Sequence, residues 1–352
     1  MRLYDGAMPA AADPSRGALR RSPSMADVAA RAGVSHQTVS RVLNGSPVVK
    51  EATRAKVLAA IGELGYRRNN AARMLVTNRS GRIGLVAAHL GLHGPSMTAL
   101  AVQDAAHAAG YDVALIGLSE MSLESLNDAV DRLLDQAVEA IVIAVAHRDA
   151  LATTRTLQLP IPVVLVQGVT PGQPMAAGID QHAGAVLATT HLLGLGHVHV
   201  AHVAGPDDWI EATQRRAGWL AAHEQHGALP GPELEGDWSA ASGYRAGRRL
   251  AEDDSVTAVF VANDDMALGV LRAMHEHGRA VPGEVSVVGF DDVPEAAYYW
   301  PALTTIGQQF SSAGRCAVEL ALRALGGEEA PAAELIPPTL FVRDSSARPR
   351  RC

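Results

Sequence analysis

Cysteine and long apolar runs are the features that this 352-residue sequence most clearly lacks. Its two cysteines, Cys316 and Cys352, cannot build the disulfide framework of a small secreted domain, and Cys316 fits a buried thiol in a helical apolar pattern. No apolar run approaches the roughly 20 residues of a membrane-spanning helix. Residues 1–22 contain no apolar segment typical of a secretion signal. These absences predict a cytoplasmic protein with no membrane partner.

The sequence also lacks the short motifs that mark common enzyme sites. Its 14 histidines form no His-Glu-x-x-His pattern and no metal-binding Cys/His spacing. Neither a P-loop nor a Gly-x-Ser-x-Gly nucleophile turn is present. The glycine pair in residues 194–197 precedes an apolar run instead of following one, so it does not fit a dinucleotide-binding turn. We therefore predict a protein that is not an enzyme and uses neither a cofactor nor a metal.

Charge is divided unequally along the chain. Residues 1–80 carry 13 Lys and Arg against 5 Asp and Glu, whereas residues 81–352 carry 17 against 32. A small basic part on an acidic body is typical of a protein whose basic part neutralises nucleic-acid phosphates. Terminal arms can be basic without such a role, so charge alone does not decide between the two interpretations.

From residue 82 onward, short apolar runs alternate with amphipathic helical patterns. The predicted strands are Ile83–Ala88, Val113–Gly117, Ala140–Val145, Val163–Val166, Val198–Val203, Ala258–Ala262 and Val285–Phe290. The predicted helices are Ser96–Ala109, Leu123–Gln136, Ala183–Leu193, Glu211–Glu224, Ala240–Glu252 and Met266–His277. Apolar strands alternating with helices indicate parallel α/β sheets covered on both faces. Because about 270 residues are too many for one small sheet, we expect two doubly wound lobes.

Residues 23–68 show the pattern of a helix-turn-helix. Ser24 and Asp27 form a capping-box start, with Asp in the position that Glu usually holds. Gly33 supplies the left-handed residue that ends the first helix, and Ser35 caps the second. A third helix, over about residues 50–64, is expected to brace this pair. Its buried face is predicted to contain Val57, Leu58 and Ile61.

The second helix presents polar side chains suited to the DNA major groove. Gln37 can form paired hydrogen bonds with an adenine, and Arg41 can pair with the O6 and N7 atoms of a guanine. The residues predicted to contact DNA from this region are Ser35, His36, Gln37, Thr38, Ser40, Arg41 and Asn44. A three-helix bundle with a solvated polar face is the plainer alternative. The Gly-Val-Ser of residues 33–35 and the basic charge argue against it.

The segment over residues 27–44 resembles the DNA-binding head of the lactose/galactose repressor (LacI/GalR) family. The similarity rests on Asp-Val-Ala at 27–29, Ala-Gly-Val-Ser at 32–35 and Thr-Val-Ser-Arg-Val-Leu-Asn at 38–44, and it continues to about residue 345. Gly-Asp-Trp-Ser at 236–239 resembles the lactose repressor branch most. The resemblance implies a small all-α head joined to an α/β core of two lobes, like that of periplasmic binding proteins, built on two doubly wound parallel sheets.

The expected domain organisation follows from this resemblance. It comprises a disordered tail over 1–22, the helix-turn-helix domain over 23–68, a hinge over 69–80, a core over 81–345 and a tail over 347–352. Within the core, the N-lobe combines about 81–179 with 310–337, and the C-lobe combines about 180–308 with 338–346.

Residues 69–80 resemble the family's hinge, which becomes a short helix only on operator DNA. Two such helices would enter the minor groove at the dyad, where Leu75 of each would wedge between central bases. The hinge residues implied to contact DNA are Asn69, Ala72, Arg73 and Leu75. An ordinary linker is the plainer alternative. Arg68 replaces a proline that is frequent in the family, and it would either loosen the turn or add a phosphate contact. Lys50 replaces a frequent Ser cap, which would weaken the start of the third helix.

Ligands of such cores bind between the lobes, at the carboxyl ends of the strands. The resemblance implies that Arg215 donates a fork of hydrogen bonds to neighbouring hydroxyls and that Trp238 stacks on a sugar ring. The complete predicted ligand set is His93, Gln167, Arg215, Trp238, Asn263, Asp291 and Phe310. Nearby polar residues receive structural roles instead, with Asp264 and Ser96 as helix caps.

Several pocket positions depart from the lactose repressor branch. Gln167 stands where that branch has a carboxylate. Small or basic residues near the ligand are replaced by Trp209, Glu211 and Thr213. The identity of the sugar therefore does not transfer from the resemblance, and both a galactoside and a larger glycoside stay open.

We predict a transcriptional repressor that binds double-stranded operator DNA as a homodimer and is released by a small sugar effector. The short polar tail after residue 344 carries no leucine-heptad helix, so a dimer is expected rather than a tetramer. One alternative is a regulator that needs a purine or a phosphorylated metabolite as co-repressor. A sugar-binding transport component is less favoured, because the chain has a DNA-binding head in place of an export signal.

Overall fold

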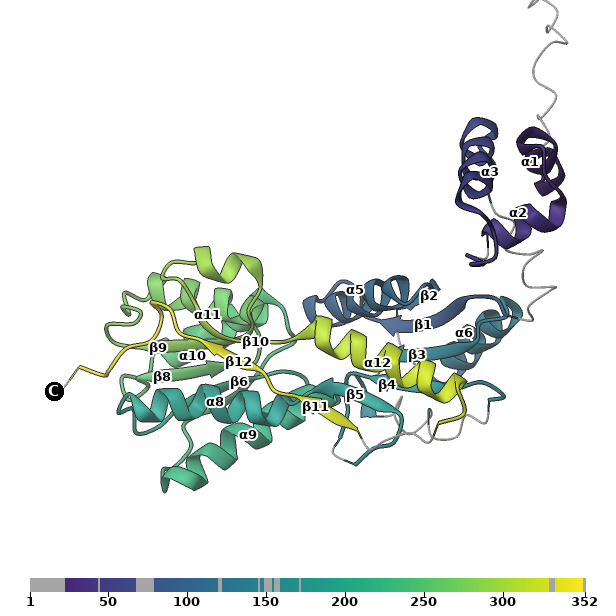
Figure 1. Ribbon diagram of the computed structural model, residues 1–352. Helices are drawn as coiled ribbons and strands as arrows, with labels where there is room; N and C mark the ends of the chain where they lie inside the picture. The colour runs from purple at the N-terminus through teal and green to yellow at the C-terminus, as the bar shows by residue number, and fades with distance from the viewer. Residues whose placement is uncertain are drawn as a thin grey trace, which may run out of the picture. The chain divides into compact units, whose positions relative to one another are not determined.

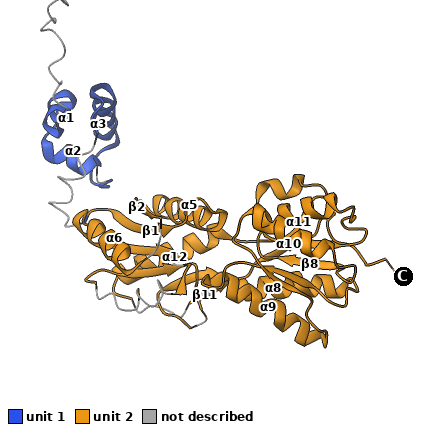
Figure 2. Cartoon of the chain, turned by 180° about the vertical axis from the view of Figure 1, so that it is seen from behind, with its two compact units in different colours: residues 1–79 blue, residues 80–352 orange. Residues whose placement is uncertain are grey.

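The computed structural model describes residues 23–43, 45–67, 79–119, 122–144, 146–148, 154, 159–170, 172–328 and 333–350. The chain divides into two compact units, residues 1–79 and residues 80–352 (Figure 2). The helices described in the first unit are α1 (Met25–Ala32), α2 (His36–Leu43) and α3 (Glu51–Leu64). Among the residues described, no helix combines the length and the apolar character needed to cross a bilayer.

The first two helices begin and end where the sequence predicts. The Ser24 hydroxyl accepts the Asp27 N–H, and the Asp27 carboxylate accepts the Ser24 N–H at 2.7 Å, which completes the capping box. Gly33 has a φ of 66° and ends α1, as a left-handed residue should. The Ser35 hydroxyl accepts the Thr38 N–H at 3.2 Å and so caps α2.

The core of the first unit is small and aliphatic. Val28, Val39 and Val57 are completely buried in it. The predicted inward role of Leu58 is wrong, because this side chain is 53% exposed. Successive helical residues are about 100° apart, so the face that buries Val57 continues through residues 60 and 61 and turns residue 58 outward. The Lys50 side chain makes no capping bond to α3, as expected from its chemistry.

The N-lobe contains a fully parallel sheet with the strand order β11-β5-β4-β3-β1-β2. Its strands are β1 (Arg82–Ala88), β2 (Asp112–Leu118), β3 (Ala140–Ala144), β4 (Val163–Val166), β5 (Ala176–Ile179) and β11 (Glu334–Ile336). Helices α5 (His93–Ala108) and α12 (Phe310–Leu325) pack on one face, and α6 (Leu123–Asp135) packs on the other (Figure 1). Cys316 lies on α12 and is half-buried, whereas Cys352 falls outside the described residues.

The C-lobe repeats this layered design with the strand order β12-β10-β9-β8-β6-β7. Its strands are β6 (Ala201–Ala204), β7 (Glu233–Glu235), β8 (Ala258–Val261), β9 (Ser286–Asp291), β10 (Thr304–Gly307) and β12 (Thr339–Phe341). Its helices are α8 (Gln181–Gly194), α9 (Ile210–His226), α10 (Ala240–Ala251), α11 (Asp264–Glu276) and the 3-10 helix η1 (Pro294–Tyr298). Helices α8 and α9 cover one face, and α10 and α11 cover the other.

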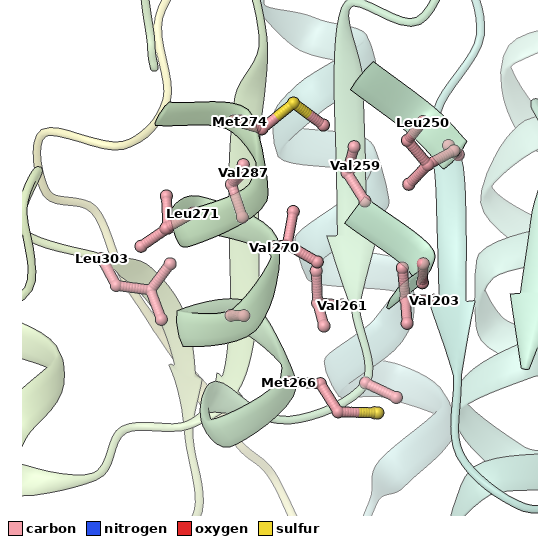
Figure 3. Packing of buried hydrophobic residues seen from close by; sticks show 14 of the residues in the cluster. Val203, Leu250, Val259, Val261, Met266, Val270, Leu271, Met274, Val287 and Leu303 are labelled. Carbon is pink, nitrogen blue, oxygen red and sulfur yellow. The ribbon is translucent and has the colours of Figure 1, made fainter. Parts of the chain in front are cut away.

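Aliphatic side chains fill the space between the C-lobe sheet and its helices, as the apolar strand patterns predict. In Figure 3, Val259 and Val261 of β8 lie in one cluster with Met266, Val270 and Met274 of α11. All five side chains are completely buried. Such packing makes this lobe a rigid support for any site at the ends of its strands.

One strand departs from the predicted parallel pairing. β12 runs antiparallel to β10, with Gly307 opposite Thr339. The reason lies in the connectivity, because β10 ends at the junction of the lobes whereas β12 begins there. Two residues separate β12 from the end of β11. The chain thus passes between the lobes after β5, after β10 and after β11, and each lobe is assembled from two separate stretches.

Two predicted element boundaries shift by several residues. β6 begins at Ala201 rather than at residue 198. α5 begins at His93, three residues before the predicted start. Pro95 fits in the first turn of this helix because the N–H groups of a first turn have no partner within the helix, so the missing N–H of proline costs no hydrogen bond. Ser96 therefore lies inside the helix and its predicted capping role is wrong. The residue at the cap is Leu92, which makes no side-chain bond there.

Candidate functional site

A cavity lies between the two lobes at the carboxyl ends of their strands. The seven residues predicted to bind a ligand all line it, namely His93, Gln167, Arg215, Trp238, Asn263, Asp291 and Phe310. His93, Gln167 and Phe310 come from the N-lobe, and the other four come from the C-lobe. The structure thus gathers the predicted set around one space, and the action of each residue on a ligand stays a prediction.

Arg215 is the most constrained charge in the cavity wall. It projects from α9 and is 5% exposed. Its Nε donates to Oε1 of Gln181 at 2.9 Å, and its guanidinium also donates to the carbonyl oxygen of Ala262. Its Nη2 lies 3.6 Å from Oδ1 of Asp291, and its Cζ lies 3.8 Å from the centre of the Phe290 ring. These contacts hold the guanidinium in one orientation.

Gln308 and Gln181 link Arg215 to Asp291 through a ring of hydrogen bonds. The Nε2 of Gln308 donates to Oδ1 of Asp291 at 2.6 Å, and its Oε1 accepts from Nε2 of Gln181 at 2.8 Å. Burial raises the pKa of Asp291, and the nearby charge of Arg215 opposes that rise. Gln181 and Gln308 were not among the predicted ligand residues. The sequence signal that could have identified Gln308 is its position just after β10. Asp291 was predicted on the same ground, because it lies at the end of an apolar strand.

Asn263, rather than Asp264, caps α11. The Asn263 Oδ1 accepts the Met266 N–H at 2.9 Å, and its Nδ2 donates to the carbonyl of Trp238 at 3.0 Å. The predicted capping role of Asp264 is wrong, because this residue is completely buried and accepts from the N–H of Val293 at 3.0 Å. Asp264 is the first residue of α11, and its carboxyl lies between β10 and the loop after β9. There it also accepts a hydrogen bond from the Thr305 hydroxyl at 2.6 Å. Burial raises the pKa of Asp264 well above its ordinary value.

Aromatic rings form part of the cavity wall. Trp238 has a φ of 70° and is 7% exposed, and its ring meets that of Trp209 edge to face at 5.5 Å. On the N-lobe side, the rings of His93 and Phe310 lie 5.8 Å apart. Such rings offer apolar faces to the C–H side of a sugar. Thr213 does not line the cavity, since its hydroxyl bonds to the carbonyl of Trp209.

Glu211 adds a buried carboxyl to the same wall. It lies on α9, one turn before Arg215, and its Oε1 accepts the Gly168 N–H at 3.0 Å. Burial raises the pKa of Glu211 to about 7. Because Gly168 belongs to the N-lobe, this bond also joins the two lobes beside the cavity.

A backbone contact between the lobes runs next to Glu211. His147 and Trp209 pair as an isolated antiparallel bridge, and the Ile210 N–H donates to the carbonyl of Ala146 at 2.9 Å. The Nε2 atoms of His147 and His89 lie 3.0 Å apart. The cavity is therefore bordered by direct contacts between the lobes, so its shape depends on how they meet.

The second candidate site is the outer face of α2 in the first unit. Ser35, His36, Gln37 and Arg41 are exposed there, whereas Thr38 and Ser40 are half-buried. The predicted contact residues outside the described residues are Asn44, Asn69, Ala72, Arg73 and Leu75. The exposed side chains include an amide and a guanidinium, the groups that pair with adenine and guanine edges.

Comparison with known proteins identifies the family. The pattern described as bacterial regulatory proteins, lacI family, matches residues 24–69, and the periplasmic binding protein-like domain matches residues 189–346. The lactose operon repressor of Escherichia coli (strain K12) is 37% identical over 327 residues, which is 92% of this chain and 90% of that protein. The chain belongs to the lacI family of bacterial regulatory proteins. Membership of the lacI family makes it a DNA-binding transcriptional regulator and not an enzyme.

Other lacI-family proteins match over similar lengths. The regulator GalS of Salmonella typhimurium (strain LT2) is 36% identical and covers 91% of this chain and 96% of its own. The crystal structure of the lac repressor dimer bound to operator and the anti-inducer ONPF gives a TM-score of 0.81 at 35% identity, covering 93% of this chain and 100% of that one. A complex of the regulator CelR with cellobiose gives a TM-score of 0.68 at 32% identity, covering 92% and 100%.

Proposed function

We propose that this lacI-family regulator is a repressor that binds operator DNA as a homodimer and releases it when a small sugar occupies the cavity between the lobes. The observation that carries the proposal is the ring of Arg215, Gln181, Gln308 and Asp291, in a wall that also holds Trp238. Fixed donors and acceptors beside an aromatic face suit a polyhydroxylated ring. Relatives named for lactose and for cellobiose support a sugar effector.

Charge in the cavity argues against a phosphorylated co-repressor. Arg215 is the only Lys or Arg among the described lining residues, and Asp291 already faces it. Glu211 adds a second carboxyl to the wall. A phosphate would therefore meet two acidic side chains and no unpaired cation. A neutral ligand avoids that cost.

The proposed control of DNA binding depends on the position of the cavity between the lobes. A ligand that contacts His93 on one side and Arg215 on the other binds best when the lobes hold one particular arrangement. In a dimer, that arrangement would set the spacing of the two heads and of the hinge residues Asn69, Ala72, Arg73 and Leu75 on DNA. Base contacts by Gln37 and Arg41 would supply sequence preference.

Exposed apolar side chains support a second copy of the chain as partner. Leu100 on α5 is 50% exposed and Leu268 on α11 is 42% exposed, and both helices lie along one side of the core in Figures 1 and 2. Tyr298 and Trp300, which follow β9, are 88% and 93% exposed. Large apolar groups of this kind are typical of protein–protein interfaces.

A selection experiment tests the proposal as a whole. Full-length protein is used to select duplexes from a random pool, and the selected duplex is then titrated with lactose, galactose, cellobiose and guanine. We expect a palindromic site whose affinity falls at least tenfold with one of the sugars. Enrichment of no palindrome would overturn the DNA-binding proposal, and a response to guanine alone would favour a co-repressor or another nucleobase effector.

A further inference from the structure

Two buried polar atoms of residues that line the cavity have no hydrogen-bond partner. They are Oε2 of Glu211 and Nε1 of Trp238. Glu211 is 6% exposed and Trp238 is 7% exposed. Buried polar atoms are nearly always paired, and an unpaired one costs free energy. One of these atoms accepts hydrogen bonds and the other donates them. The wall thus retains one unused acceptor and one unused donor.

The position of the Glu211 carboxyl is fixed although one of its oxygens is unpaired. Oε1 accepts the Gly168 N–H at 3.0 Å, which orients the group across the junction of the lobes. Arg215 is one turn further along α9, but its guanidinium bonds to Gln181 and the Ala262 carbonyl and lies beside Asp291. No ion pair to Glu211 is found within the described residues. Because Glu211 lines the cavity, a molecule bound in that cavity is the candidate partner for Oε2.

We propose that Glu211 is a specificity-determining residue of the effector site: its Oε2 accepts a hydrogen bond from a hydroxyl or ammonium of the ligand, while Nε1 of Trp238 donates to a ligand oxygen. This inference rests on the proposed function, because it takes the cavity as the effector site. A buried carboxylate discriminates strongly against a ligand that lacks the matching hydrogen-bond donor, because the carboxylate is then left unpaired. An apolar wall discriminates much less against a ligand that lacks one methyl group. Glu211 would thus narrow the range of sugars that this regulator senses.

The protonation of Glu211 gives the proposal a second readout. Burial raises the pKa of Glu211 to about 7. The backbone amide of Glu211 itself, the charge of Arg215 and the Gly168 amide oppose this rise, and Asp291 adds to it. His93 also lines the cavity. A ligand donor needs an unprotonated Oε2, so affinity should increase between pH 6 and pH 8. A protonated carboxyl that donates to the ligand would give the opposite slope.

The test compares Glu211→Gln with a matched control. The Gln side chain can keep the bond from Gly168 through its oxygen, but it then places an NH2 group where Oε2 was. Glu224→Gln removes the same charge from an exposed position on the same helix. Calorimetry of the full chain would use lactose, galactose, cellobiose and galactosamine at pH 6, 7 and 8.

The expected result is a loss of at least tenfold in affinity and of the pH slope in Glu211→Gln, with no change in Glu224→Gln. Tighter binding of galactosamine than of galactose, lost in Glu211→Gln, would identify the donor as an ammonium, and equal or weaker binding would identify a hydroxyl. A sugar that binds the wild type and Glu211→Gln equally would overturn this inference alone. Failure of every probe to bind the wild type would overturn the sugar effector together with it.

Thermal unfolding without ligand separates this role from a structural one. A buried carboxylate that lacks one partner destabilises the fold, so Glu211→Gln should unfold at the same temperature as the wild type or higher at pH 8. A melting temperature lowered by several degrees would show that Glu211 supports the fold and would overturn the assignment.

Discussion

Arg215 and Asp291 form a buried ion pair in the wall of the cavity, with 3.6 Å between Nη2 and Oδ1. Both side chains are more than nine-tenths buried, so each charge depends on the other and on the amides around them. Removing one member of such a pair leaves the other charge buried without a partner, and this costs about 3–5 kcal/mol.

Arg215→Ala should therefore lose both ligand binding and stability. We expect affinity for the proposed sugar effector to fall at least tenfold and the free energy of unfolding to fall by about 3–5 kcal/mol. Urea denaturation and calorimetry measure the two effects. Arg216→Ala is the matched control, because Arg216 is exposed and pairs with Glu233 at the surface, where an ion pair contributes about 1 kcal/mol or less. An unchanged ligand response in Arg215→Ala would contradict the proposed site.

The proposed DNA-binding face of α2 makes a separate prediction. Arg41→Ala should weaken binding to the selected operator by about 1–3 kcal/mol, because a base-edge contact is lost. Binding to random DNA should weaken less, so the ratio of specific to non-specific affinity should fall. Lys56→Ala removes one exposed charge from α3 and serves as the control. Equal losses on both kinds of duplex would assign Arg41 to a phosphate instead of a base.

The stability of the core should fall in mild acid because of His202. Its Nδ1 donates to the carbonyl of Phe260 at 3.0 Å, and its ring stacks on Phe260 and Trp219. Burial lowers the pKa of His202 to about 4 from an ordinary value of 6.5. Between these values the unfolded chain binds a proton that the folded chain does not, so stability decreases as the pH falls from 6.5 to 4, by on the order of 3 kcal/mol in total.

His202→Phe tests this account. Chemical denaturation at pH 7 and pH 4.5 should show a smaller loss of unfolding free energy in the variant than in the wild type. The exposed His107→Phe is the control and should keep the wild-type slope. Equal slopes in all three proteins would show that His202 does not cause the acid sensitivity.

The crossing of α10 and α11 depends on glycine. A Cβ at Gly269 would overlap the carbonyl oxygen of Ala240, and one at Gly243 would overlap the backbone of Met266. Gly269→Ala should therefore lower the free energy of unfolding by about 1–3 kcal/mol, the range for an overpacked core. Gly194 on α8 has open space around it, so Gly194→Ala should be neutral or slightly stabilising. A stable Gly269→Ala variant would mean that the two helices can separate without cost.

The sequence predicts the buried strands and the caps well because their signals are local. The apolar run over 163–166 and the Ser24–Asp27 capping box need no knowledge of distant residues, and both form as predicted. β7, with exposed Glu233 and Glu235 around a partly buried Leu234, has no apolar run that would reveal an edge strand. The seven residues implied by the family resemblance all line the cavity, and their contact with a ligand stays a prediction. The unpaired oxygen of Glu211 depends on how two lobes meet, which no local pattern contains.

The three passages of the chain between the lobes bear on the order in which the protein can be completed. As the ribosome extends the chain, the first stretch of the N-lobe emerges before the C-lobe but lacks α12 and β11. Helix α12 covers one face of the N-lobe sheet together with α5, and β11 forms one edge of that sheet. Those pieces appear only after β6 to β10 of the other lobe have been made. Until nearly the whole polypeptide is available, the nascent N-lobe therefore keeps part of one apolar face and one edge of its sheet uncovered. Exposed surfaces of this kind in incomplete chains are what chaperones protect.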